Sequence, residues 1–283
     1  MSIYKIPGPL LIALGGLFLS SGGTIFRSFE MTDPWTIYFW RSVFFAPSVF
    51  LFVILTTEKK SDLVLKFKNL GWVGLLCAIL YATSSGSYMF ALKYTTIANV
   101  VFIISTQTFL LAISGYFFLK EKINLSTVIA ILMAGAGLYI MIGTKISGGT
   151  ALGNAFAFVI PVGFTIIVTL IRTFKTIDMV PAVAVSGIFA AAAGFFFSGP
   201  IAISLHDLIL VFFFGALQYA PGFICLTLGS RTTPSAKIGI FAFSEALAAP
   251  IWAWMFINEI PPLGVLIGGA IIFLAILLKS VRE

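Results

Sequence analysis

Ten apolar runs, each about 20 residues long, follow one another along the chain. A bilayer core is crossed by about 20 apolar residues in a helix, whereas the strands of a membrane barrel alternate in segments of about ten. The runs lie at about residues 8–26, 34–56, 70–92, 96–119, 125–143, 151–171, 180–198, 207–228, 235–257 and 262–279. The sequence therefore predicts an all-α membrane protein with ten transmembrane helices.

The composition excludes several other classes of protein. Hydrophobic residues make up 60% of the chain and charged residues 10%, against about 45–50% and 25% in soluble domains. The two cysteines, Cys77 and Cys225, lie inside apolar runs, so neither a disulfide framework nor a zinc site is indicated. The sequence contains no phosphate-binding loop, dinucleotide fingerprint or metal-ligand cluster. We therefore expect no cofactor, and no transport that this chain alone drives with ATP.

The basic residues predict how the chain is inserted, because cytoplasmic loops carry an excess of Lys and Arg. With the N-terminus in the cytoplasm, most of the 17 basic residues lie on that side, and Arg27, Lys93 and Lys145 lie outside. The cytoplasmic set is Lys5, Lys59, Lys60, Lys66, Lys68, Lys120, Lys122, Arg172, Lys175, Arg231, Lys237, Lys279 and Arg282. We predict a multi-pass protein of the inner (plasma) membrane with both termini in the cytoplasm. This bias explains the net charge of +7 without a nucleic-acid partner.

The two halves of the chain repeat each other. A shift of 138 residues pairs Tyr81 with Tyr219, Thr95 with Thr233 and Glu121 with Glu259, and a shift of 145 pairs Arg27 with Arg172 and Asp33 with Asp178. Each half contains five runs, an odd number, so the halves enter the membrane with opposite orientation. Inverted repeats of this kind place a substrate site near the bilayer midplane. We predict two five-helix repeats, residues 1–145 and 146–283, around a central cavity.

Three motifs carry a family resemblance. They are Ala91–Asn99 (ALKYTTIAN), Leu119–Lys122 (LKEK) and Glu245–Trp254 (EALAAPIWAW), the last followed by Asn258-Glu259. Together with the ten runs and the repeat, they resemble the EamA-type ten-helix members of the drug/metabolite transporter superfamily. The resemblance implies a basket-like bundle that moves a small metabolite, often an amino acid, with export slightly favoured over uptake. Family members usually carry a proline where this chain has Thr108 and Ala246, so no proline predicts a kink at these places.

Glu245 and Gln107 are the main candidates for a site. Glu245 lies near the middle of the ninth run, where a charged carboxylate costs about 2.5–3.5 kcal/mol, and Gln107 is its repeat mate in the fourth run. We expect both to bind substrate at the repeat interface, and Glu245 to exchange a proton during the cycle. The alternatives are a packed, permanently protonated Glu245 and a Gln107 that only joins two helices.

Further side chains in the runs are candidates for the cavity wall. Arg41 is expected to pair with Glu30, with Glu245 or with a substrate carboxylate, or else to snorkel to the outer interface. The predicted substrate-binding set is completed by Ser84, in a polar patch of the third run, and by the aromatic residues Tyr81, Tyr88, Tyr219 and Trp252. Aromatic faces bind cations, and ordinary packing is the alternative. The repeat mates Asn99 and Lys237 are predicted gate residues, with snorkelling as the alternative for Lys237.

The predicted function is secondary active transport of a small organic metabolite, an amino acid or related amine-bearing compound, by alternating access. The alternative is proton-coupled uptake or exchange of a quaternary-ammonium or other cationic compound. An enzyme acting on lipid is disfavoured because the single histidine, His206, stands in a loop beside Asp207 without a catalytic cluster. A channel or scaffold role is a further alternative, and a channel would be distinguished by a flux that does not saturate with substrate concentration. The expected partners are the substrate, the bilayer and protons, and the chain is expected to act as a monomer or homodimer.

Overall fold

The computed structural model describes residues 2–142, 150–258 and 263–280, and the regular elements in these ranges are all helices. The first half contains η1 (Ser2–Lys5), α1 (Gly8–Leu19), α2 (Gly22–Arg27), α3 (Pro34–Thr56), α4 (Lys60–Lys68), α5 (Gly71–Tyr94), α6 (Ile97–Ser105), α7 (Gln107–Leu119) and α8 (Leu125–Ile142). The second half contains α9 (Ala151–Thr173), α10 (Val180–Phe197), α11 (Leu205–Phe212), the π-helix η3 (Phe213–Tyr219), α12 (Ala220–Thr232), α13 (Ser235–Ala242), α14 (Ser244–Ile257) and α15 (Leu263–Ser280).

The lengths of these helices confirm the all-α membrane fold. Within the described ranges, eight segments are long and apolar enough to cross a membrane. They are Gly8–Arg27, Pro34–Thr56, Gly71–Tyr94, Asn99–Leu119, Ala151–Thr173, Val180–Phe197, Leu205–Thr232 and Ser235–Phe256. Two shorter apolar helices, Leu125–Met141 and Leu263–Lys279, coincide with the fifth and tenth predicted runs. The polar stretch between the second and third runs also folds, into the short helix α4.

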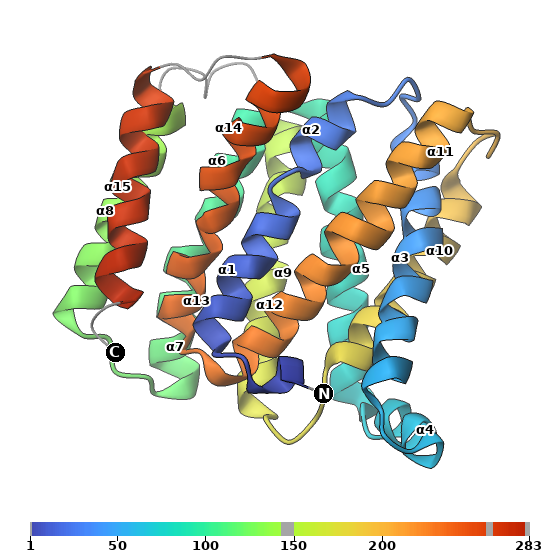
Figure 1. Ribbon diagram of the computed structural model, residues 1–283, viewed down its shortest axis with the longest axis horizontal. Helices are drawn as coiled ribbons and strands as arrows, with labels where there is room; N and C mark the ends of the chain where they lie inside the picture. Colours follow the sequence, from blue (N-terminus) through green and yellow to red (C-terminus); the bar gives the residue numbers. More distant parts are fainter. Residues whose placement is uncertain (1, 143–149, 259–262, 281–283) are drawn as a thin grey trace.

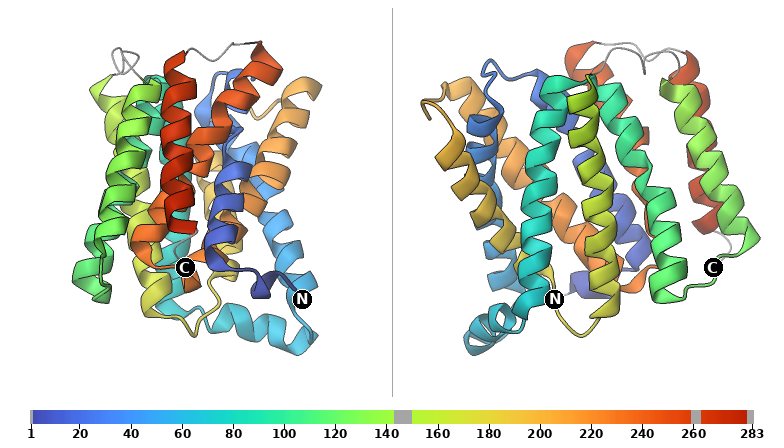
Figure 2. Two further views of the ribbon diagram at one scale, coloured as in Figure 1. Left: turned by 60° about the vertical axis from the view of Figure 1, so that its left-hand side comes forward. Right: turned by 180° about the vertical axis from the view of Figure 1, so that it is seen from behind.

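Both chain ends lie at the same end of the bundle, which we call the basal end (Figure 1). The basal end also carries α4 and the turn between α12 and α13, whereas the turn between α5 and α6 lies at the opposite, apical end. A chain that starts and finishes at the same end of the bundle crosses it an even number of times, which agrees with ten helical runs. Figure 2 shows α8 and α15 side by side at one edge, in agreement with their close packing.

The packing of the helices follows an approximate twofold relation. Three helix pairs, α3–α10, α8–α15 and α7–α13, pack a helix of the first half on its counterpart in the second half. The twofold relation also makes the pair α1–α12 correspond to the pair α9–α5. Gly8 of α1 lies directly against Thr233 at the basal end. Its counterpart under the 145-residue shift, Gly153 of α9, lies directly against Thr95 at the apical end. The contacts thus relate the same residues as the sequence shifts do, while the proposed boundary at 145/146 falls outside the described residues.

Several spans are interrupted near their middle. The first span breaks between α1 and α2, the fourth breaks at Thr106 and the ninth breaks at Phe243. The span from α11 to α12 contains the π-helix η3 instead. Short π-helical segments are rare and occur often at functional sites. These irregular segments all contribute or adjoin residues that line the interior cavity described next.

Candidate functional site

A cavity lies inside the bundle and is bounded by residues from both halves of the chain. The lining residues are Gly16, Leu19, Tyr81, Ser84, Tyr88, Ile104, Gln107, Ile160, Phe164, Ile167, Gln218, Tyr219, Phe223, Leu226, Ala242 and Glu245. Six residues predicted from the sequence are therefore brought together here. They are Glu245, Gln107, Tyr81, Tyr88, Tyr219 and Ser84.

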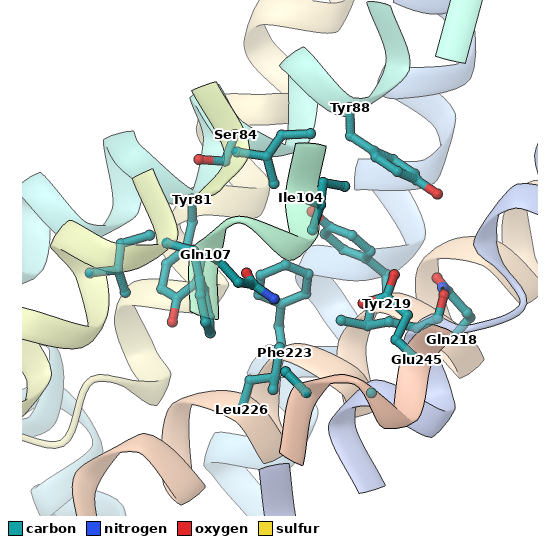
Figure 3. Close-up of a pocket in the computed structure, with 16 residues that line it drawn as sticks. Tyr81, Ser84, Tyr88, Ile104, Gln107, Gln218, Tyr219, Phe223, Leu226 and Glu245 are labelled. Atoms are coloured by element: carbon teal, nitrogen blue, oxygen red, sulfur yellow. Dashed lines mark hydrogen bonds between the residues drawn. The ribbon is translucent and has the colours of Figure 1, made fainter. Parts of the chain in front are cut away.

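Glu245 and Gln107 occupy matching places in two interrupted helices. Gln107 begins α7 directly after the break at Thr106, and Glu245 lies in the first turn of α14 directly after the break at Phe243. Both side chains are half-buried, and neither forms a hydrogen bond or ion pair with the residues that the structure describes. Figure 3 shows Gln107 projecting toward the centre of the cavity and Glu245 lying near Tyr219. Both polar groups therefore remain available to a ligand.

The break before Glu245 forms without a proline. The Phe243 N–H bonds to the Ile240 carbonyl at 3.2 Å, one residue nearer than in a regular α-helix. The Gly239 carbonyl thereby loses its helical partner, and it accepts the Thr108 hydroxyl instead, at 3.2 Å. Thr108 stands where the resemblance described from the sequence would place a proline. A hydrogen bond between α7 and α13 thus supports the interruption that proline would otherwise favour.

Three tyrosines and Ser84 form much of one wall. The Tyr81 hydroxyl lies 2.8 Å from Thr227 Oγ1, which joins α5 to α12 across the wall. Tyr219 is 8% exposed and Tyr88 is half-buried. The buried Ser84 hydroxyl has no hydrogen-bond partner among the residues that the structure describes. The wall therefore combines aromatic faces with an unused hydroxyl group.

Trp252 does not line this cavity, so the expectation from the sequence is corrected. Its indole N–H donates to the Ser20 hydroxyl at 2.7 Å, at the end of α1. Although Trp252 and Glu245 share a helix face, seven residues separate them by about 10 Å along the axis. The Trp252 side chain therefore joins α14 to the break between α1 and α2.

Arg41 lies next to the cavity but does not line it. Only 1% of the residue is exposed, so it does not snorkel. The guanidinium donates to the Ser85 carbonyl at 3.3 Å and to the Ser85 hydroxyl, and its Cζ lies 4.2 Å from the centre of the Tyr219 ring. Among the described residues it forms neither of the expected ion pairs with Glu30 and Glu245. Tyr219 therefore contacts both the guanidinium and the cavity.

The predicted gate residues lie at opposite ends of the bundle and away from the cavity lining. At the apical end, the Asn99 amide donates to the Thr95 hydroxyl at 3.1 Å. That hydroxyl donates in turn to Asn154 of α9 at 3.0 Å. Lys237 is half-buried in the first turn of α13, at the basal end. Asn99 thus lies in a polar network at the apical end, and Lys237 lies at the basal end.

A denser polar network closes the basal end. Arg172 Nε and Nη2 each lie 2.6 Å from Glu121 Oε1. Glu121 Oε2 accepts the Ser235 backbone N–H at 2.8 Å, and Arg172 also donates to the carbonyls of Ser230 and Thr233. We call these five residues the basal lock. The lock joins the end of α7, the end of α9 and the turn between α12 and α13.

A second basal cluster fastens the N-terminal segment. The Tyr4 hydroxyl donates to Asp178 Oδ2 at 3.1 Å, and Lys66 Nζ of α4 lies 3.4 Å from the same oxygen. Burial, and then the charge of Asp178, raises the pKa of Tyr4 to about 12, so the hydroxyl keeps its proton and remains a donor. The cluster ties η1 and α4 to the turn between α9 and α10.

Sequence reasoning missed Gln218 and the basal lock. Gln218 lines the cavity, and its amide N–H donates to the Leu19 carbonyl at 2.8 Å. Its Oε1 is buried and has no hydrogen-bond partner within the described ranges. An amide in the middle of an apolar run was the available signal, because polar groups at that depth are costly. Glu121 and Arg172 stood out in the repeat alignment, but no local pattern shows that they meet.

Three similarities to known proteins bear on this site. Residues 6–143 match the EamA-like transporter family. The chain is 24% identical to a Clostridium kluyveri protein named "Uncharacterized transporter". The alignment covers 95% of this chain and 91% of that protein. A solved structure described as "Crystal structure of protein" aligns with a TM-score of 0.79 over 98% of this chain and 99% of that chain. Its sequence identity is 14%, so this last likeness concerns the fold alone.

Proposed function

Because residues 6–143 match the EamA-like transporter family and a relative of similar length is named a transporter, we propose that this chain is an EamA-type transporter of the drug/metabolite transporter superfamily. In this proposal it moves a small amine-bearing metabolite, most simply an amino acid, by alternating access. In this proposal, residues 1–145 and 146–283 are inverted repeats that rock around the central cavity. The twofold pattern of helix contacts supports such a division. The excess of Lys and Arg at the basal end supports a basal side in the cytoplasm and an inner-membrane location.

The observation that carries this proposal is the unpaired carboxylate of Glu245 in an otherwise mostly apolar cavity. A primary ammonium group offers three N–H donors. Glu245 and the Gln107 carbonyl are free acceptors for them, since neither has a partner among the described residues. The Coulomb attraction is strong because few other polar groups screen it there. The apolar part of the substrate then packs on Phe223, Ile104 and the tyrosines.

Glu245 also serves as the proton-coupling residue in this proposal. A bare carboxylate in an empty apolar cavity is costly, so a proton takes the place of the ammonium group when substrate has left. Each cycle then exchanges substrate for a proton at one carboxyl group. Protons that enter the cell down their gradient would in this way drive export of the substrate.

In this proposal, the basal lock and the apical chain of hydrogen bonds through Asn99, Thr95 and Asn154 act as the two gates. The segments that the basal lock joins also carry cavity-lining residues, so a basal opening requires the Glu121–Arg172 contact to break. Lys237 adjoins the lock and completes this gate. The Asn99–Thr95–Asn154 chain ties α6 to α9 at the apical end. Thr95 is the repeat mate of Thr233 in the lock, as expected for gates that work in turn.

A quaternary-ammonium substrate is the second candidate, because three tyrosine side chains border a carboxylate in one cavity. Aromatic faces bind methylated ammonium groups without hydrogen bonds. Competition separates the two candidates. An amine site prefers L-leucine over choline, whereas an aromatic cage prefers choline.

The direct test uses purified protein reconstituted into liposomes. A thermal-shift screen of amino acids and amines identifies a ligand, and its radiolabelled form is followed with and without a pH gradient. We expect Glu245→Gln to reduce transport at least tenfold and to abolish its pH dependence. Glu30→Gln is the matched control, because that carboxylate lies at the apical surface and bonds to Ser204. A Glu245→Gln protein with full rate and full pH dependence would refute the proposal.

A further inference from the structure

Arg41 carries a buried positive charge that its surroundings satisfy only in part. Its Nη2 donates to Ser85, but its Nη1 is buried and has no hydrogen-bond partner in the described part of the chain. A guanidinium offers five donors and stays charged at any physiological pH. Burial of such a group without a counter-charge is unfavourable. Nη1 therefore has donor capacity that the described residues do not use.

No carboxylate from the neighbouring helices meets this charge. Helix α3 packs against α4, α5, α10, α11, α12 and η3. Helix α4 carries Asp62, but it adjoins the basal end of α3, whereas Arg41 lies in the apical part of α3 (Figure 1). Within the described residues, α5, α10, α12 and η3 contain no Asp or Glu, and neither does α3 itself. Asp207 of α11 is already occupied, because it accepts the backbone N–H groups of Glu30 and Met31 at 3.0 and 2.9 Å. Among the described residues, the helices packed against α3 thus leave the charge of Arg41 without a carboxylate partner.

The π-helix η3 explains why aromatic rings surround Arg41. The guanidinium Cζ lies 5.0 Å from the centre of the Phe214 ring and 4.2 Å from that of Tyr219. These residues are five positions apart, and the wider turn of a π-helix brings such residues onto one face. In a regular α-helix they would point in different directions. The chain thus adopts a rare turn that holds two rings over a buried cation.

Only a thin partition separates Arg41 from the cavity. Tyr81, Tyr219 and Phe223 line both the main cavity and a smaller hollow beside it. Ser85, the hydrogen-bond partner of Arg41, also lines this hollow. Tyr88 and Tyr219 lie within electrostatic range of both Arg41 and Glu245. One positive and one negative group thus face the same tyrosines from two sides.

We propose that Arg41 is a carboxylate subsite, reached when the Tyr219 ring swings aside, so that the transported substrate is a zwitterion and not a simple amine. The inference rests on the proposed function, in which Glu245 takes the ammonium group. The substrate carboxylate binds Nη1 and the Ser85 hydroxyl while the ammonium group binds Glu245. Arginine is suited to this role because its planar donors match a carboxylate.

The test compares three ligands that share one side chain. L-leucine has an ammonium and a carboxylate, 3-methylbutylamine lacks the carboxylate, and L-leucinamide replaces it with a neutral amide. The set L-phenylalanine, 2-phenylethylamine and L-phenylalanine amide repeats the comparison with an aromatic side chain. Dissociation constants are measured by calorimetry on wild type, Arg41→Gln, Arg41→Lys and Ser85→Ala. Arg27→Gln is the matched control, since that residue lies in α2 and does not line the cavity.

In wild type, we expect the amino acid to bind at least tenfold more tightly than its amine and its amide. Arg41→Gln should remove this preference and leave amine affinity within threefold, and Arg41→Lys should restore part of it. Equal binding of all three ligands by wild type overturns the carboxylate subsite and leaves the amine site intact. That comparison needs no variant, so it decides the question even if Arg41→Gln does not fold. Failure of both amines and both amino acids to bind overturns the proposed function itself.

Discussion

The contact between Gly239 and Thr108 allows a prediction with a calculable size. An ideal Cβ at position 239 would lie 2.6 Å from Thr108 Cα and 2.8 Å from Thr108 Cγ2. Carbon atoms normally approach to about 3.5–4.0 Å. Gly239→Ala therefore forces α7 and α13 apart by about 1 Å, because the nearest atom belongs to the backbone and cannot rotate away.

The expected magnitude follows from two opposing effects. Overpacking of a tight contact costs about 1–3 kcal/mol, and alanine gains up to about 1 kcal/mol over glycine within a helix. The net loss of unfolding free energy is then about 1–2 kcal/mol, or a fall in Tm of about 2–3 °C for a chain of this length. Separation of α7 from α13 also moves Gln107 away from Glu245, so we expect at least a threefold weaker affinity for substrate.

The assay is thermal unfolding of detergent-solubilised protein, with ligand binding measured on the same preparations. Gly269→Ala is the matched control, because its new Cβ would meet only Leu247 Cδ2 at an ordinary 3.6 Å. This control should keep or raise Tm, since it has the helix gain without the clash. If Gly239→Ala has the same Tm as Gly269→Ala and binds substrate with wild-type affinity, the close contact does not hold the site in place.

Three further predictions test other parts of the structure. Thr108→Val removes the hydroxyl that the Gly239 carbonyl accepts; it should lower stability by about 1 kcal/mol, measured as a lower Tm, and an unchanged Tm would contradict the role given to this bond. Arg172→Gln breaks the basal lock, and its effect is measured with a reporter cysteine, Leu226→Cys, in protein that lacks Cys77 and Cys225. We expect this cysteine to react at least threefold faster with a maleimide applied from the basal side. An unchanged reaction rate would show that the lock is not a gate. Trp252→Phe loses the bond to Ser20; it should lower Tm slightly while substrate affinity stays within twofold, whereas a tenfold loss of affinity would return Trp252 to the binding site.

Much of the candidate site could be predicted because the repeat placed Glu245 opposite Gln107. Both residues interrupt apolar runs at corresponding positions, and the structure places both in one cavity. Trp252 could not be placed correctly, because the same helix face extends beyond the cavity and contacts Ser20 there. The surroundings of Arg41 were equally hidden, since no local pattern predicted that η3 would adopt a π-helical turn.

The apolar runs alone determine that this chain crosses a membrane as helices, because in lipid each segment must satisfy its own backbone hydrogen bonds. That requirement is local, so it can be recognised in any stretch of about 20 residues. Which polar groups meet is decided only in the tertiary structure, as for Arg172 with Glu121 and Thr108 with Gly239. Between helices in lipid, burial of apolar surface has little preference among partners, and shape and a few hydrogen bonds choose the arrangement.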